Sequence, residues 1–181
     1  MCHALLRDTR FFELLTVLDS DLADQARLQG CPCGGRLHQA HYPRKPRGGP
    51  ADLSPEPERR FSFCCGRDGC RRRRTPPSLR FLGRRVYFGV VVVLATAMAH
   101  GVTPRRAAEL RTQLGVDRRT LARWRQWWQE HLPTSVFWRE QGARFSPPIL
   151  ADALPGALLD RFAPEGEPGG VVSLLRFLAP L

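Results

Sequence analysis

Lysine and long apolar segments are both scarce in this sequence. Lys45 is the only lysine among 28 basic residues. The most apolar run, 86–99, is shorter than the roughly 20 residues that a membrane-spanning helix needs. The N-terminus has charges spread through it and no small-residue cleavage site of the secretory kind. We therefore expect a cytoplasmic protein that does not enter a membrane.

The charge that is present favours an anionic partner. The chain of 181 residues has a formal net charge of +11 and a pI of about 10.8, a balance typical of nucleic-acid-binding proteins. Nearly all of the positive charge is arginine, in a sequence also rich in Ala, Gly and Pro, which is the residue usage of a GC-rich genome. That bias makes arginine runs weaker evidence, but it does not explain the excess of positive over negative charge.

The six cysteines indicate a metal site, because thiols in a reducing compartment bind metal more often than they form disulfides. Two cysteine turns, CPCGG at 31–35 and CCGRDGC at 64–70, are joined by two candidate strands at 36–42 and 59–64. A hairpin between two cysteine turns is typical of a zinc ribbon, in which four thiolates hold a tetrahedral zinc ion. We predict structural Zn²⁺ with the ligands Cys31, Cys33, Cys65 and Cys70.

The spacing of the cysteines leaves alternatives open. Ribbon pairs usually have two intervening residues, whereas the pairs here have one and four. We prefer Cys65 to Cys64 because Gly66 follows it, as a knuckle turn requires, but Cys64 or His38 can take the place of one ligand. The remaining alternative is a degenerate, metal-free site with buried free thiols.

Apolar periodicity predicts two helices outside the cysteine-rich segment. In the segment 10–29, the apolar residues that recur at helical spacing are Phe11, Leu14, Leu15, Leu18 and Leu22. We expect the segment 78–100 to be a helix that is buried nearly all round. Its four consecutive valines have strand propensity, so a strand at 86–94 is the alternative.

Residues 103–132 have the pattern of two helices joined by a tight turn. Thr103 is a suitable N-cap before a proline at the first helical position, Gly115 ends the first helix, and Asp117 caps the second. The apolar residues on the inner face of the second helix are Leu121, Trp124, Trp128 and Leu132.

This pattern predicts a helix-turn-helix, in which the recognition helix 117–132 offers its N-terminal residues to the major groove of DNA. The residues that point outward there are Arg118, Arg119, Thr120 and Arg123. Arginine in such a position binds guanine or phosphate. An ordinary helical hairpin with solvated arginines is the alternative.

Four consecutive arginines follow the second cysteine turn, and they are Arg71, Arg72, Arg73 and Arg74. They either contact the DNA backbone or stay solvated. In the C-terminal segment, proline interrupts short helices expected at 135–141, 149–162 and 171–178. The last of these is too apolar to stay in water, so it either returns to the core or meets a partner.

We therefore expect a mainly α fold with a small β zinc ribbon. A helix-turn-helix core of three helices is joined to an N-terminal helix and to a proline-punctuated helical tail. The expected parts are an amphipathic helix at 1–30, a ribbon-like segment at 31–75, a DNA-binding domain at 78–132, and short helices with flexible links at 133–181.

This order of parts resembles the N-terminal region of bacterial insertion-sequence transposases and of their small DNA-binding accessory proteins. The likeness covers about 31–131 and rests on the cysteine turns, the exit GCRRRRTPPS and the helix ending RRTLARWRQWW. It implies zinc held by the paired cysteines, the four outward residues of 117–132 at recognition positions, and binding to the terminal repeats of a mobile element.

The chain departs from a full transposase after Leu132. Transposases continue into an RNase-H-like domain whose carboxylates hold two metal ions, whereas this segment has few acids and no run of strands. We expect a non-enzymatic protein that binds double-stranded DNA, with a homo-oligomer or a separate catalytic transposase chain as further partners. The alternatives are a subunit or fragment of a transposase, and a protein-interaction module that does not bind DNA.

Overall fold

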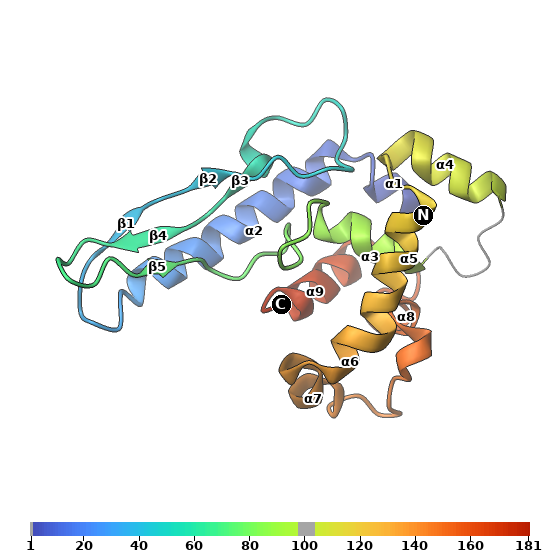
Figure 1. Cartoon of the computed structure of the whole chain (residues 1–181). Helices are drawn as coiled ribbons and strands as arrows, with labels where there is room; N and C mark the ends of the chain where they lie inside the picture. Colours follow the sequence, from blue (N-terminus) through green and yellow to red (C-terminus); the bar gives the residue numbers. More distant parts are fainter. Residues whose placement is uncertain (1, 98–103) are drawn as a thin grey trace.

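The chain folds into an elongated arm and a helical body that meet at an angle (Figure 1). The computed structural model describes residues 2–97 and 104–181. We call α2 and the five strands, residues 9–75, the arm, and we call α1 (Cys2–Leu5) together with residues 78–181 the body. The described residues are mainly helical and include a small antiparallel sheet, as expected.

The long helix α2 (Thr9–Leu28) runs along the arm and into the body (Figure 1). It begins at Asp8, whose side chain accepts a hydrogen bond from the amide of Arg10. Its extent agrees with the sequence prediction, but its buried face is rotated from the predicted stripe. Leu14 is 45% exposed, whereas Asp19 is buried. The prediction was based on the spacing of apolar residues alone, so it did not include a buried aspartate.

Short antiparallel strands cover α2 in the arm. One sheet has the order β1 (Leu37–Gln39), β4 (Phe63–Cys65) and β5 (Arg73–Arg74), and a second pairs β2 (Tyr42–Pro43) with β3 (Arg59–Arg60). Each of the two predicted strands is thus split in two, and β5 lies in the run of arginines, where no strand was predicted. The split lets the hairpin bend along the helix.

The arm has a very small core of its own. The buried residues of this cluster, which is separate from the core of the body, are Ala23, Cys31, Leu37, Phe63 and Cys65. Two of these five are cysteines, so the apolar side chains alone bury little surface there. The arm therefore needs stabilisation beyond the hydrophobic effect.

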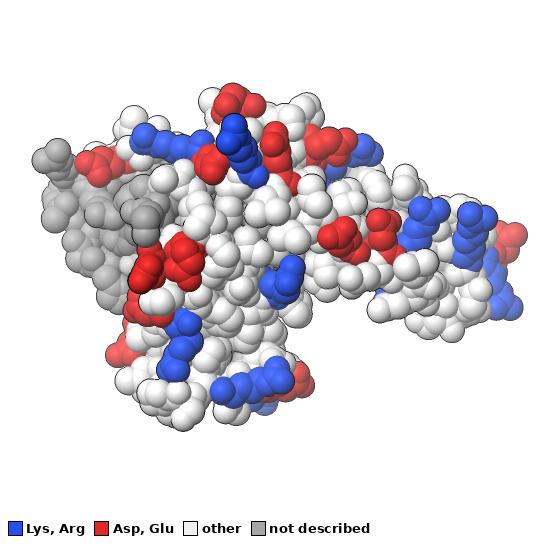
Figure 2. All heavy atoms as spheres, turned by 180° about the vertical axis from the view of Figure 1, so that it is seen from behind, with Lys and Arg blue, Asp and Glu red and all other residues white. Residues whose placement is uncertain are grey.

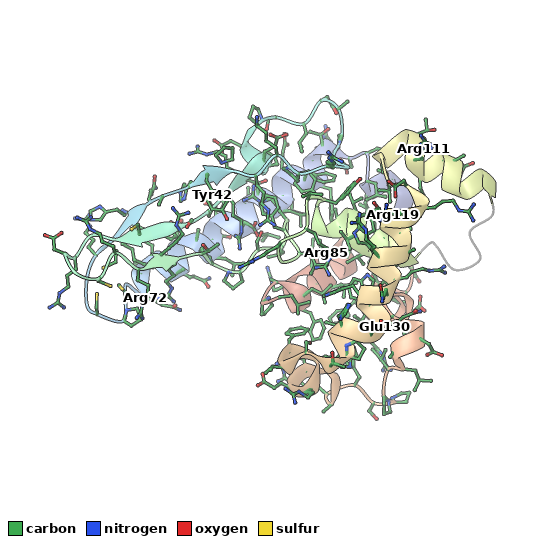
Figure 3. The ribbon with its side chains drawn as sticks, in the orientation of Figure 1. Tyr42, Arg72, Arg85, Arg111, Arg119 and Glu130 are labelled. Carbon is green, nitrogen blue, oxygen red and sulfur yellow. The ribbon has the colours of Figure 1, made fainter. Side chains whose placement is uncertain are left out.

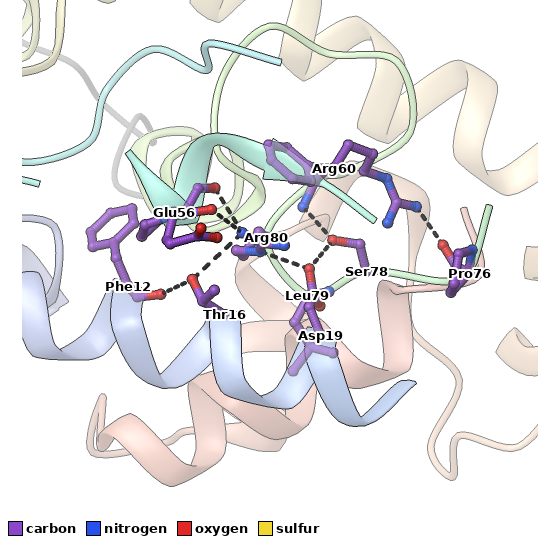
Figure 4. A network of polar contacts seen from close by, with 11 residues as sticks. Phe12, Thr16, Asp19, Glu56, Arg60, Pro76, Ser78, Leu79 and Arg80 are labelled. Atoms are coloured by element: carbon purple, nitrogen blue, oxygen red, sulfur yellow. Dashed lines mark hydrogen bonds and ion pairs between the residues drawn. The ribbon is translucent and has the colours of Figure 1, made fainter. Parts of the chain in front are cut away.

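The segment after β5 crosses from the arm to the body without helix or strand, which the sequence did not predict. Asp19 accepts hydrogen bonds from the Ser78 hydroxyl, from the Leu79 amide at 2.6 Å and from Nε of Arg80 at 2.8 Å (Figure 4). Nη1 of Arg80 donates to the Pro57 carbonyl at 2.9 Å. These contacts hold residues 78–80 against α2, so the helix expected from residue 78 cannot begin there.

The apolar helix begins instead at Gly89, as α3 (Gly89–Ala97). Its four valines are all fully buried, so the helix has no exposed face among residues 90–95. The alternative of a strand at 86–94 is wrong. The surrounding body buries every face of this short helix, and tertiary packing overrides the strand propensity of valine.

Two further helices, α4 (Pro104–Leu114) and α5 (Arg118–Gln126), are joined by a tight turn as predicted. Gly115 has a φ of +64° and ends α4, while the predicted cap Thr103 lies outside the described residues. A π-helical turn, Trp127–His131, continues α5 and leads into α6 (Leu132–Thr134). The four residues of the predicted inner face are all buried: Leu121, Trp124, Trp128 and Leu132.

The C-terminal segment closes the body. It contains α7 (Val136–Gly142), α8 (Gly156–Phe162) and α9 (Pro168–Leu178), close to the predicted positions. Leu174 and Leu178 of α9 are buried in the same cluster as α3, so this apolar helix returns to the core. Among the described residues, no helix has the length and apolar character to span a membrane.

Candidate metal centre and nucleic-acid interface

The four cysteines predicted as metal ligands lie together at the end of the arm. The Sγ atoms of Cys31, Cys33, Cys65 and Cys70 all lie within 4.8 Å of one another. The Cys31–Cys70 and Cys33–Cys65 sulfur pairs are separated by 3.8 and 3.5 Å. A tetrahedral ion with metal–sulfur bonds of about 2.3 Å needs sulfurs about 3.8 Å apart. The cluster therefore has the dimensions of a four-thiolate metal site.

Two tight turns bring these sulfurs together. In the first, the Gly34 amide donates to the Cys31 carbonyl at 2.8 Å, and in the second, the Cys70 amide donates to the Arg67 carbonyl at 3.1 Å. Gly35 is required for the close approach, because a Cβ there would lie 2.5 Å from the Cys65 sulfur. The CxCGG and CGxxGC patterns thus suit these two turns in spite of their unequal spacing.

The cluster makes two of its thiols differ strongly in acidity. A hydrogen bond from the Gly35 amide, together with the neighbouring cysteines, lowers the pKa of Cys33 to about 6. The amide of Arg67 favours the thiolate of Cys65, but burial and the other three cysteines outweigh it and raise the pKa of Cys65 to about 12. A divalent cation would favour the thiolate at every position and would release protons on binding.

The alternative ligands considered from the sequence point elsewhere. The Cys64 Sγ lies 3.5 Å from the Arg71 carbonyl, and Cys64 is outside the group of sulfurs that could share an ion. His38 pairs with Cys64 across the β1–β4 ladder and is exposed. Strand alternation explains the result, because adjacent residues of β4 face opposite sides of the sheet.

The four consecutive arginines border the arm sheet instead of forming a free linker. The Arg71 guanidinium pairs with Asp68 at 2.9 Å, and that of Arg73 lies 5.7 Å from the centre of the Tyr42 ring. Arg74 donates to the Gly30 carbonyl at 2.6 Å, so it fixes the end of α2. Arg72 and Arg73 are exposed, and Figure 3 shows Arg72 at the edge of the arm.

The predicted recognition residues separate into two groups. Arg118, Arg119 and Arg123 are exposed on α5, and Figure 3 shows Arg119 near the start of that helix. Thr120 is buried, and its hydroxyl accepts a hydrogen bond from Arg123 at 3.1 Å. Thr120 therefore positions an arginine at the wall of the groove described below.

A groove follows α5 on the side that faces residues 84–87. Its volume is about 620 Å³, and the charged residues and aromatic rings that line it are Arg84, Arg85, Arg123, His131, Tyr87, Trp124 and Trp127. The Arg85 guanidinium lies 3.7 Å from the centre of the Trp127 ring, and burial lowers the pKa of Arg85 to about 10. Sequence reasoning missed Arg84 and Arg85 because it placed them inside a buried helix.

Charges of both signs are present on the rear face of the molecule (Figure 2). Figure 2 shows acidic and basic side chains interspersed on the rear of the arm and body. Arg72, Arg85 and Arg119 come from the arm, the junction and α5 respectively (Figure 3). The arginines at these three places are the candidate nucleic-acid interface.

Comparisons with known families, curated proteins and solved structures give no match to this chain. Its description therefore rests on its own elements: an arm with four clustered cysteines at its end, and a helical body with a groove lined by arginine and tryptophan.

Proposed function

We propose that this protein is a non-catalytic, zinc-stabilised protein of transposase-like origin that binds double-stranded DNA. The observation that carries the proposal is the grouping of Arg118, Arg119 and Arg123 on α5 beside a groove that adds Arg84 and Arg85. Arginines at the start of a second helix are suited to base edges in the major groove, and those at its flank to phosphate.

The metal has a structural role in this proposal. Four thiolates complete a tetrahedral shell and leave no position for substrate, which is the pattern of structural zinc sites. Cys31, Cys33, Cys65 and Cys70 would hold the ion, and the ion would fix the sheet that carries Arg72 and Arg73. The arm would then contact the DNA backbone next to the site occupied by α5.

The hypothesis of a transposase subunit with a separate catalytic chain has less support. It relied on an apolar C-terminal tail that could contact a partner, whereas α9 is packed in the core of the body. The interpretation as a protein-interaction module differs from the main proposal in one measurable respect, because it predicts no salt-dependent binding to duplex DNA.

The test is to measure the binding of metal-loaded protein to duplexes selected from a random pool, over a series of salt concentrations. We expect Arg118→Ala and Arg119→Ala to weaken binding to the selected duplex by about 1–3 kcal/mol. Arg144→Ala, an exposed arginine beyond α7, is the matched control and should leave binding unchanged.

Three outcomes of this test are informative. An equal loss on selected and unrelated duplexes would make the two arginines phosphate contacts only. No salt-dependent binding to any duplex would reject the proposed function in favour of a protein-interaction module. Cleavage of the duplex by the purified chain with Mg²⁺ would contradict the non-catalytic assignment.

A further inference from the structure

A second pocket lies where the arm meets the body, and its walls carry an excess of positive charge. Its volume is about 480 Å³. The arm contributes Tyr42, Arg44, Arg60 and Thr75, and the body contributes Arg84 and the residues after α9. Three arginines from three separate stretches of the chain thus face one pocket.

No Asp or Glu side chain of the described residues lines this pocket. The guanidinium carbons of Arg44, Arg60 and Arg80 lie 5.1, 5.8 and 5.2 Å from the centre of one ring, that of Phe81. Asp19 is the carboxylate of this cluster, and it is already bound to Arg80. In the part of the chain that the structure describes, no carboxylate lies within ion-pair distance of Arg44, Arg60 or Arg84.

Arg60 is the most unusual member of the group. Its side chain is buried, with 8% exposure, and one nitrogen donates to the Pro76 carbonyl. Its Nη1 is buried and has no hydrogen-bond partner among the described residues. Burial lowers the pKa of Arg60, in opposition to the attraction of Asp19. A buried cation with an unused donor is costly unless an anion compensates it.

Arg44 holds the pocket in shape. Its Nη2 donates to the carbonyls of Gly83 at 2.8 Å and Arg85 at 3.2 Å, which fixes the loop that carries Arg84 beside the β2–β3 hairpin. The position of the Arg44 side chain and that of the backbone next to Arg84 are therefore set in advance of any ligand. Guanidinium groups in such an arrangement favour oxyanions, above all phosphate, with which they form paired hydrogen bonds.

We propose that this pocket binds a phosphate group, and that in the complex this group belongs to the DNA backbone. The second part rests on the proposed function. Its support is that Arg84 lines both this pocket and the groove along α5. A strand that follows the groove would therefore reach the pocket before it reaches Arg72 and Arg73 on the arm.

The first arm of the test uses inorganic phosphate alone. Thermal melts of the metal-loaded protein in phosphate are compared with melts in chloride at equal ionic strength. We expect phosphate to raise the melting temperature to a plateau, because a ligand that binds only the folded state stabilises it. The shift should be lost in Arg44→Gln and Arg60→Gln and kept in the control Arg144→Gln. In Arg60→Gln, the glutamine retains a donor for the Pro76 carbonyl. If Arg60→Gln does not fold, Arg44→Gln alone tests the pocket.

The second arm measures DNA affinity against salt concentration for the same variants. Loss of one backbone contact should reduce the slope of log K against log salt by about 0.9 in Arg44→Gln. Suppose that phosphate shifts the melting temperature but that the slope of log K against log salt is the same in wild type and Arg44→Gln. The phosphate group bound in the pocket would then belong to a free phosphate compound and not to the DNA backbone. The same melting shift in wild type and Arg44→Gln would overturn the pocket itself. Phosphate binding without any DNA binding would reject the proposed function and leave the pocket standing.

Discussion

The arm and the body achieve their stability in different ways. The body buries apolar residues from α1 to α9 in one cluster, in which most side chains are almost completely inaccessible to solvent. The arm has only a small cluster of its own, made of Ala23, Cys31, Leu37, Phe63 and Cys65, while Phe11, Phe12 and Leu15 of α2 pack into the cluster of the body. A cluster of this size offsets little of the loss of chain entropy, so we expect the arm to depend on metal bonds more than the body does.

The two regions also differ in how they use arginine. In the arm, Arg74 fixes the end of α2, and Arg71 pairs with a neighbouring aspartate. On α5, Arg118 and Arg119 are exposed, and Arg123 borders the groove. A run of four arginines is therefore weaker evidence for DNA contact than three arginines spaced along one helix.

The largest expected effect separates the two regions through the metal. Removal of metal with a strong chelator, or Cys65→Ser, should unfold the arm and leave α3, α8 and α9 folded. We expect amide hydrogen exchange in residues 31–75 to accelerate roughly a thousandfold or more, because the free energy of metal binding is also folding free energy. Exchange in the body should change far less.

Cys64→Ser is the matched control, since Cys64 is adjacent in sequence but outside the sulfur cluster. It should bind about one metal ion per chain, as the wild type does, when measured by elemental analysis. Loss of metal in Cys64→Ser and its retention in Cys65→Ser would show that the ligand set is wrong. Absence of metal in the wild type would favour the degenerate, thiol-only site.

A second prediction concerns the ion pair that joins the regions. Asp19 and Arg80 are both fully buried, and Asp19→Ala would leave the Arg80 charge without its carboxylate. We expect a loss of about 3–5 kcal/mol in the free energy of unfolding, measured by urea titration. The double variant Asp19→Leu with Arg80→Met should recover much of the loss. A double variant as unstable as the single one would mean that the pair does more than balance charge.

A third and smaller effect tests whether α3 has any exposed face. Val91 and Val93 lie on nearly opposite sides of this helix, and both are fully buried. We expect Val91→Ala and Val93→Ala each to reduce the free energy of unfolding by about 2–3 kcal/mol, because each removes two methyl groups from a packed core. A large effect at one position and almost none at the other would indicate an amphipathic helix instead.

The features that could be predicted from sequence are those set by neighbouring residues. Gly35 and Gly66 mark the cysteine turns, and the glycine after Cys65 correctly distinguished it from Cys64 as a member of the cluster. Likewise, Gly115 and Asp117 lie at the two ends of the turn between α4 and α5, whose geometry depends on local backbone preferences.

The features that could not be predicted depend on partners far away in the chain. Asp19 lies on a helix of regular apolar spacing, and its burial follows from Arg80, which is separated from it by 61 positions. The same contact keeps residues 78–80 out of a helix, so the helix expected from residue 78 begins only at Gly89. The second pocket combines Arg44, Arg60 and Arg84, none of which stands out in sequence, since the charge imbalance exists only after folding.

The smallest predicted effect lies at the turn between α4 and α5. The Asp117 carboxylate accepts hydrogen bonds from the Thr120 amide, at 2.6 Å, and from other groups of the first turn, and these bonds lower its pKa. A carboxyl whose pKa is lower in the folded state stabilises the protein above its unfolded pKa, and this contribution is lost as pH falls through the folded value. Asp117→Ala should therefore lower the melting temperature by about 2–4 °C at pH 7 and by much less near pH 2.5.

Asp160→Ala, at an exposed aspartate of α8, is the control and should show neither change. A deficit in Asp117→Ala that is as large at pH 2.5 as at pH 7 would mean that the side chain contributes by packing, and not as the charged cap of the proposed recognition helix.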